Sequence, residues 1–308
     1  MASNEMDVCD VSVVKVNLEN LKLWKSIFRS IKSVVDGGPV SLCIHKAGYV
    51  TVKTHDSAHV ALLIFKMSCD VEGLEDDDIS LVLNSAKLDL KLNMPKEQHD
   101  VALVYCPNAP IDKNLFLFEE ESEGCASFNT YRLNLLNDDT EEPGLPPNNE
   151  TFLFSIVLEM SLLRGVLSNA NTLKGETISF IISQSKSKTS PTSDVVNRLR
   201  IVVGIGSDDE FEKCFTTLHE NSQDAKRIEL DGPALRGAQP VAEAPFVVKL
   251  DATYSVKQLL DFLGALEPQT ICIGLSKNMP LKLTYPLDET GESFIHFYAA
   301  PRIRDDDE

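Results

Sequence analysis

Apolar and polar positions in residues 21–35 follow the 3.6-residue repeat of a helix that is buried on one side. Counted at 100° per residue, one face gathers Leu23, Trp24, Ile27, Phe28, Ile31, Val34 and Val35. The opposite face carries only cations, within about 80° of one another: Lys22, Lys25, Arg29 and Lys32. The following Asp36-Gly37-Gly38-Pro39 predicts the helix end, because glycine accepts left-handed turns and proline cannot continue a helix.

Segments rich in β-branched residues surround this helix and predict strands. In the first half they are 11–17, 39–45, 49–55, 59–67, 79–84, 100–106, 114–120 and 127–135. In the second half they are 151–159, 178–183, 199–205, 244–253, 270–276, 281–287 and 293–299. Helices are expected to begin near residues 18, 84, 160 and 255, each entered from a strand. The order therefore recurs, which predicts two similar α+β domains with two helices each on antiparallel sheets.

Residues 85–94, SAKLDLKLNM, give an ambiguous signal. Their apolar positions alternate, which is strand periodicity, but Lys87 and Lys91 share a helical face at i,i+4. The duplicated element order favours a helix.

The predicted domain boundaries follow from composition. Residues 11–135 form an N-terminal domain, and the proline-rich, acidic stretch 136–150 is a connector. Residues 151–303 form a C-terminal domain, with surface insertions expected at 183–197 and 206–243, and 304–308 is an acidic tail.

Composition narrows the function classes. The chain of 308 residues has a formal net charge of −18, and its seven cysteines are scattered without a CxxC pair. No disulfide framework, zinc ribbon, signal peptide or membrane span is expected, which predicts an intracellular protein. A surface this acidic repels nucleic acid, so any DNA contact requires a segregated basic surface.

The basic face of residues 21–35 has two interpretations. It is either a solvated lysine face or a surface for a polyanion. Solvated helix faces usually mix signs and gain i,i+4 pairs, whereas this face is wholly positive, which favours the polyanion.

The hypotheses of an enzyme or a metal site have weaker support than that of a polyanion-binding surface. His55 and His59 stand four residues apart, but their segment reads as strand–turn–strand and supplies no third ligand. The GxG of residues 204–206 lacks a third glycine and a following helix, which disfavours a nucleotide site. We predict no catalytic residue, metal or cofactor; a metal- or nucleotide-dependent enzyme is the distant alternative.

Four ordered segments give the chain a resemblance to the proliferating cell nuclear antigen (PCNA) family of DNA sliding clamps. They are HDSAHVALL (55–63), TYRLNLLNDDTEEPGLPPNNE (130–150), SKNMPLKLTYPL (276–287) and FYAAPRI (297–303). The resemblance spans roughly residues 11–303.

This resemblance implies a nuclear homotrimeric ring whose helices line a hole for duplex DNA. Subunits would join by edge pairing between residues 127–135 of one chain and 197–205 of the next. The DNA-binding candidates are Lys22, Lys25, Arg29, Lys32, Lys87, Lys91, Arg164 and Lys257. The second half supplies one cation per helix, so uneven DNA contact is expected.

The resemblance also implies an apolar groove that binds short peptide motifs of a DNA polymerase and other replication or repair proteins, and a clamp loader as a further partner. Its candidates are His59, Val60, Leu145, Pro146, Pro280, Ala300, Pro301 and Ile303. Two related alternatives are one subunit of a heterotrimeric DNA-damage checkpoint ring, and a monomeric or dimeric viral processivity factor at a site of viral DNA replication.

Overall fold

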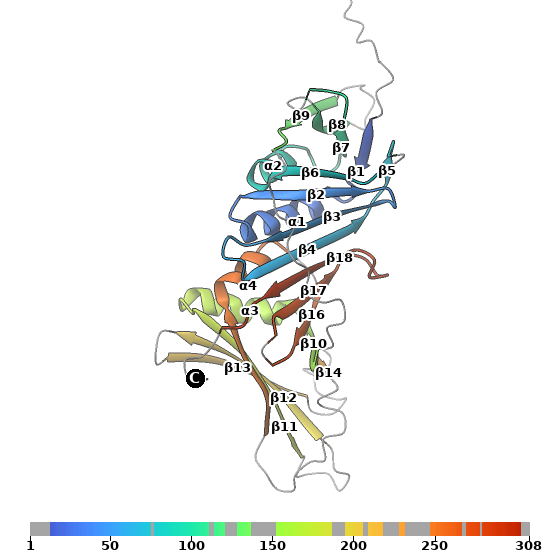
Figure 1. The fold of residues 1–308 in the computed structure, drawn as a ribbon. Coiled ribbons are helices and arrows are strands. Elements are labelled where there is room, and N and C mark those ends of the chain that lie inside the picture. The colour runs from blue at the N-terminus through green and yellow to red at the C-terminus, as the bar shows by residue number, and fades with distance from the viewer. Residues whose placement is uncertain are drawn as a thin grey trace, which may run out of the picture. The chain divides into compact units, whose positions relative to one another are not determined.

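The structure is a computed structural model of the whole chain (Figure 1). It describes residues 13–74, 77–110, 114–120, 128–136, 152–186, 195–205, 209–217, 228–231, 247–266, 269–277 and 279–302. The chain divides into two compact units. The N-terminal unit comprises residues 1–57 and 64–142, and the C-terminal unit comprises 58–63 and 143–308. The division near residue 142 falls inside the predicted connector, of which residues 137–150 lie outside the described part.

The first half of the chain contains two helices and nine strands among its described residues. In chain order they are β1 (Val14–Asn17), α1 (Leu21–Val34), β2 (Pro39–His45), β3 (Tyr49–His55), β4 (Ala61–Ser68), β5 (Val71–Glu72), β6 (Ile79–Asn84), α2 (Ser85–Leu92), β7 (Asp100–Tyr105), β8 (Leu115–Glu120) and β9 (Phe128–Leu133).

The second half repeats this order element by element. It contains β10 (Phe154–Glu159), α3 (Met160–Thr172), β11 (Thr177–Lys186), β12 (Val195–Ile205), β13 (Asp209–Thr217), β14 (Ile228–Asp231), β15 (Val247–Ser255), α4 (Val256–Leu263), β16 (Thr270–Leu275), β17 (Leu281–Pro286) and β18 (Phe294–Ala299). The predicted α+β class with two helices in each half is confirmed.

Strand pairing is duplicated as well. In the first half the neighbours are β5-β1-β7-β8-β9, and a second set runs β4-β3-β2-β6. In the second half the corresponding neighbours are β14-β10-β16-β17-β18 and β13-β12-β11-β15. Every residue-level strand pairing that the structure defines among the described residues is antiparallel.

The apolar stripe of α1 forms the centre of the N-terminal core. Trp24, Ile27, Phe28 and Ile31 are all buried, and the rings of Trp24 and Phe28 both meet the ring of Phe65 on β4 edge to face. The Asn20 side chain caps the helix by accepting a hydrogen bond from the Leu23 N–H at 3.2 Å. Gly37, at φ 73°, turns the chain after the helix as the sequence predicts.

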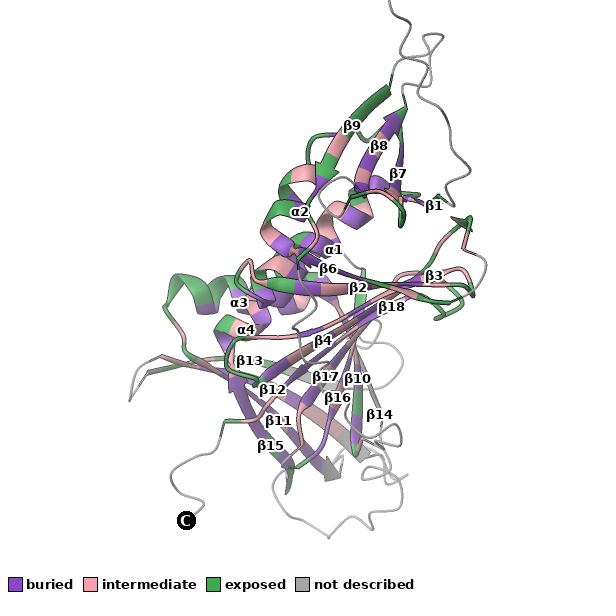
Figure 2. Cartoon of the chain, turned by 45° about the horizontal axis from the view of Figure 1, so that its top comes forward, coloured by how far each residue is buried: buried purple, intermediate pink, exposed green. Residues whose placement is uncertain are grey.

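Residues 85–92 are helical, so the duplicated order predicted α2 correctly where apolar alternation pointed to a strand. Asn84 caps α2 by accepting from the Lys87 N–H at 2.9 Å. Leu88 and Leu92 are buried, whereas Leu90 is 59% exposed. Figure 2 shows where buried and exposed residues lie along the helices and strands.

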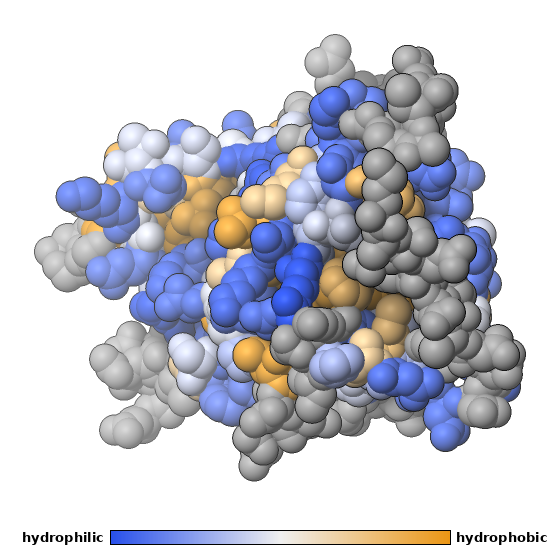
Figure 3. Space-filling view, turned by 90° about the horizontal axis from the view of Figure 1, so that it is seen from above, coloured by the Kyte–Doolittle hydropathy of each residue, from blue (hydrophilic) through white to orange (hydrophobic). Residues whose placement is uncertain are grey.

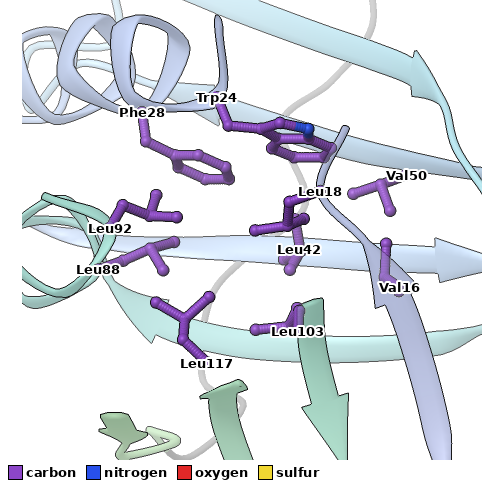
Figure 4. Close-up of a pocket in the computed structure, with 10 residues that line it drawn as sticks. All are labelled: Val16, Leu18, Trp24, Phe28, Leu42, Val50, Leu88, Leu92, Leu103 and Leu117. Carbon is purple, nitrogen blue, oxygen red and sulfur yellow. The ribbon is translucent and has the colours of Figure 1, made fainter. Parts of the chain in front are cut away.

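A small apolar cavity of about 20 Å³ lies in the N-terminal core (Figure 4). Trp24 and Phe28 from α1, Leu88 and Leu92 from α2, and apolar residues of β1, β2, β3, β7 and β8 line it. This volume holds at most one water-sized molecule, and the lining offers no polar partner. We interpret it as a packing cavity where helices and sheets meet.

The C-terminal core also contains packed aromatic side chains. Phe262 of α4 stacks on Phe297 of β18 with ring centroids 4.5 Å apart, and Phe180 packs near Tyr254 at 6.2 Å. Tyr254 is fully buried, and its hydroxyl has no hydrogen-bond partner among the described residues. Burial raises the pKa of Tyr254, so the phenol stays protonated.

Two predicted insertions need correction. The span 206–243 contains β13 and β14, and the ends of 183–197 belong to the long strands β11 and β12. β13 reads DEFEKCFTT, whose acids and lysine hide the strand signal because an edge strand tolerates charge.

In the described part of the chain, no helix is both long and apolar enough to cross a membrane.

Two tyrosine-to-phenylalanine substitutions separate a satisfied hydroxyl from an unsatisfied one. Tyr131→Phe removes a hydroxyl that donates to the buried Glu119 carboxylate at 2.6 Å, so we expect a loss of about 1.5–3 kcal/mol. Tyr254→Phe removes a buried hydroxyl without a partner, so we expect unchanged or higher stability, by up to about 1 kcal/mol. Urea denaturation followed by circular dichroism measures both, and equal losses would contradict this assignment of the hydroxyls.

Candidate functional site

Helices α1 and α2 lie side by side in the N-terminal unit and together carry all six predicted N-terminal cations. Lys22, Arg29 and Lys87 are exposed, and Lys25, Lys32 and Lys91 are partly exposed. The single acid on the two helices is Asp89. The apolar stripes of both helices face the core, so the cations gather on the side turned away from it. We call these six residues the basic helix face.

The sequence predicts that this face is wholly positive, with no acid beside its cations, and this prediction is wrong at Lys32. The Lys32 ammonium lies 2.7 Å from a carboxylate oxygen of Asp89, whose side chain is only 8% exposed. Asp89 stands 57 residues further along the chain, so no local pattern around α1 could reveal this pair.

Two further cations of α1 fasten the turn that follows α2. Lys25 donates from its ammonium to the Pro95 carbonyl at 2.9 Å, and Arg29 donates from its guanidinium to the Asn93 side-chain carbonyl at 3.3 Å. The Asn93 amide in turn donates to the Asp89 carbonyl at 2.8 Å. The basic helix face therefore holds the helix pair together as well as presenting positive charge.

The corresponding helices of the C-terminal unit are poor in charge. α3 carries Arg164, which is partly exposed, and α4 carries the exposed Lys257 with Asp261 four residues later. Two cations and one acid on this pair contrast with six cations and one acid on α1 and α2. The cations are thus unevenly divided between the two halves, and the uneven DNA contact expected from this stays a prediction.

Five of the eight predicted groove residues lie in described parts of the C-terminal unit. His59 and Val60 are exposed, and the Val60 carbonyl accepts a hydrogen bond from the Ala300 N–H at 2.8 Å. Leu281 pairs with Ala299, which brings Pro280 beside Ala300, and Pro301 follows. The other three candidates, Leu145, Pro146 and Ile303, lie outside the described residues. The structure thus brings together three segments that are far apart in the sequence.

Of the two strands predicted to join subunits, one is an outer strand of its sheet and the other is an interior strand. β9 is an outer strand of its sheet, as expected for residues 127–135. The expected partner 197–205 belongs to β12, which pairs with β11 on one side and with β13 on the other. An interior strand offers no free backbone edge; the outer strands of this sheet are β13, next to β12, and β15 at the other side.

A buried carboxylate anchors β9. Glu119 on β8 is 2% exposed and accepts four hydrogen bonds, listed by donor and length: Tyr131 hydroxyl 2.6 Å, His99 Nδ1 2.7 Å, Lys96 N–H 2.9 Å and Asn129 amide 3.1 Å. Burial alone would raise the pKa of Glu119, but these hydrogen bonds outweigh it and hold the pKa at about 2. Glu119 therefore ties the segment after α2 to the β9 edge.

Hydrophilic side chains separate the apolar patches on the face shown in Figure 3. Phe128 on the outer strand β9 is 62% exposed, and its ring stacks on Phe118 with centroids 5.2 Å apart. Phe128 therefore stands on an outer strand, whose unpaired backbone edge can accept a strand of another chain.

Comparisons with known proteins show the fold. No protein-family model matches the sequence, and no curated protein matches it. Among solved structures, proliferating cellular nuclear antigen from Entamoeba histolytica aligns with a TM-score of 0.69 and 16% identity over 95% of this chain and 100% of that one. A structure described as the PCNA2-PCNA3 complex from Sulfolobus tokodaii aligns with a TM-score of 0.67 and 14% identity, over 94% and 99%. The chain has the sliding-clamp fold. More particularly, it has the fold of PCNA along nearly its whole length.

The stability of the β9 edge should depend on pH through Glu119. Because its pKa is lowered from 4.5 to about 2, the carboxylate stabilises the fold fully above about pH 4.5. This contribution, about 3 kcal/mol, is lost as the pH falls from about 4.5 towards 2. We expect Glu119→Gln to be less stable than wild type at pH 7 and the difference to close over that interval.

Denaturant titrations at several pH values measure this difference. Glu120→Gln, a change at the neighbouring exposed glutamate, serves as the matched control and should keep the pH dependence of the wild type. A gap for Glu119→Gln that stays constant down to pH 2 would refute the role of the ionised carboxylate.

Proposed function

We propose that the chain is a DNA sliding clamp, a processivity factor that encircles duplex DNA and tethers DNA polymerase and other replication or repair proteins. The observation that carries the proposal is the basic helix face, placed on the helices of a chain with the PCNA fold. The proposal is of a binding role without catalysis.

The charges of the basic helix face suit a duplex that slides. Lysine and arginine contact phosphates mainly through counterion release, which is independent of base sequence. Contacts of this kind leave no deep energy minimum at any position along the DNA. The rest of the protein is strongly acidic, with a net charge of −18 for the chain, and repels DNA from other surfaces.

The hydrogen bonds within the basic helix face rank its members. Lys32 is neutralised by Asp89, and Lys25 is engaged with the Pro95 carbonyl, so both contribute less to DNA than the sequence suggested. Lys22, Arg29 and Lys87 are the most exposed cations of the face. We assign the main phosphate contacts to these three residues; Arg29 uses one nitrogen for Asn93, and its guanidinium keeps further N–H donors for a phosphate.

Duplication of the fold supports ring closure through β9 and β13. By element order, β9 corresponds to β18 and β13 corresponds to β4. Within the C-terminal unit, the segment leading into β4 lies beside the end of β18, where Val60 accepts from Ala300. The equivalent outer strands β9 and β13 would join successive copies head to tail by strand addition.

Partner binding would use the surface around Val60, Pro280 and Ala300. The exposed Val60 and the partly exposed Pro280 and Ala300 suit a short peptide with aliphatic and aromatic anchors. A mixed ring is the second candidate function, favoured by the likeness to a structure described as a complex of two different PCNA chains.

Charge reversal on the basic helix face tests the DNA contact. We expect Lys22→Glu combined with Lys87→Glu to weaken binding to a short linear duplex by about tenfold or more and to reduce the salt slope by about 2. Fluorescence anisotropy at a series of salt concentrations measures both quantities.

The matched control is Lys46→Glu combined with Lys53→Glu, which changes the charge equally within the same unit. Lys46 lies in the turn between β2 and β3, and Lys53 alternates with the buried Val52 on β3. This control should leave affinity and slope unchanged; an equal effect of both pairs would assign the binding to net charge alone.

The mass of the assembly tests ring closure. A homotrimer should show about three times the chain mass of 34.1 kDa in light scattering. Phe128→Asp, at the β9 edge, should shift the mass towards that of the monomer, whereas Leu173→Asp, an exposed change after α3, should not. A wild-type chain that remains monomeric at micromolar concentration would exclude a self-closing ring.

A further inference from the structure

A cysteine, a histidine and an aspartate converge on one face of the N-terminal unit, away from the basic helix face. One possible ligand atom each from Cys43, His45 and Asp78 lies within 4.8 Å of the other two. Among the described residues, these three side chains lie close enough together to hold a metal ion.

Strand register produces this convergence. Cys43 and His45 are two residues apart on β2 and so point to the same side of the sheet. The intervening Leu42 and Ile44 are buried towards the helices, which leaves Cys43 and His45 half-buried on the opposite side. β6 pairs with β2 so that Ile79 stands opposite Ile44, and Asp78 therefore reaches His45.

Surrounding groups fix the orientation of the Asp78 carboxylate. Asp78 accepts the Lys46 N–H at one carboxylate oxygen, 2.9 Å away, and meets His45 Nδ1 at the other, 2.6 Å away. These two contacts hold the Asp78 carboxylate in place and aim it at the imidazole.

The imidazole is held from two further directions. Its Nε2 lies 2.8 Å from the Thr51 hydroxyl, and its ring stacks on Tyr49 with centroids 4.2 Å apart. Tyr49 in turn carries the Lys66 ammonium 4.5 Å from its ring centroid. A histidine ligand whose second nitrogen is held by an outer partner is the usual arrangement at metal sites.

We propose that Cys43, His45 and Asp78 bind one Zn²⁺ ion. Thiolate, imidazole and carboxylate together form a ligand set that zinc accepts, with a water molecule completing the tetrahedron. The ion takes the place of the proton between His45 Nδ1 and Asp78, and the Cys43 sulfur completes the three protein ligands. Ligand atoms of a tetrahedral zinc site lie about 3.2–3.7 Å apart, so the histidine–aspartate pair opens slightly while the cysteine closes in.

Proton balance is simple for this site. The Cys43 thiol releases its proton to solvent, because the thiolate is the ligand. The imidazole keeps one proton, which resides on Nε2 and is donated to the Thr51 hydroxyl oxygen. No redox step or further reactant is involved.

This site differs from the histidine pair that the sequence offered. His55 Nδ1 contacts the Asp56 carbonyl at 2.9 Å, and His59 lies exposed in the following turn. Cys43 and Asp78 are 35 positions apart, so strand pairing is needed to bring them together. The zinc proposal is independent of the proposed clamp function, because its measurement involves neither DNA nor a ring.

Metal titration of the full chain tests the proposal. Chelator-treated, reduced protein is titrated with ZnCl₂ by calorimetry and with CoCl₂ by absorption spectroscopy. We expect one equivalent of zinc with micromolar or tighter affinity, and a thiolate-to-cobalt charge-transfer band in the near ultraviolet. Cys43→Ser and Asp78→Asn should each weaken zinc binding by about tenfold or more.

Cys106→Ser is the matched control, since Cys106 is a partly exposed thiol of the same unit outside the group. It should bind zinc as the wild type does. Absence of saturable binding, absence of the charge-transfer band, or unchanged affinity in Cys43→Ser would overturn the proposal. The cobalt spectrum of the wild-type chain decides the outcome even if a variant fails to fold.

Discussion

Burial of the apolar stripe of α1 is the interaction on which the N-terminal unit depends. Trp24 and Phe28 close over Phe65 and fill the space between two sheets, where burial of large aromatic side chains contributes most to stability. This packing fixes the rotation of the helix. Because the apolar stripe must face inwards, the cations on the other side must face outwards. One packing constraint thus determines both the core and the candidate DNA surface.

Local periodicity predicted the elements that obey it. The apolar repeat of residues 21–35 predicted α1, and β6 begins and ends at the expected residues 79 and 84. Tertiary context determines that α2 is a helix. Its alternating leucines resemble a strand, but Leu88 and Leu92 are buried at helical spacing and Leu90 is exposed. β13 escaped prediction because four of its nine residues are charged, which an outer strand tolerates and an interior strand does not.

The candidate sites depend more on contacts that are distant in sequence. Composition and spacing identified every cation of the basic helix face, but the buried Asp89 beside Lys32 comes from a different helix. Likewise, no spacing rule links Cys43 and His45 to Asp78, because only the β2–β6 register brings them together. Sequence patterns therefore predict which side of an element is polar, whereas the pairing of charges and ligands requires the three-dimensional structure.

The chain path has a consequence for dissecting the molecule. Residues 58–63 belong to the C-terminal unit although they are flanked in sequence by the N-terminal unit. A fragment cut at the connector would deprive the Ala300 N–H of its acceptor at Val60 and leave the end of β18 uncovered. A cut at the connector therefore separates residues 58–63 from the compact unit to which they belong, so fragments of this protein should be designed by spatial unit and not by sequence order.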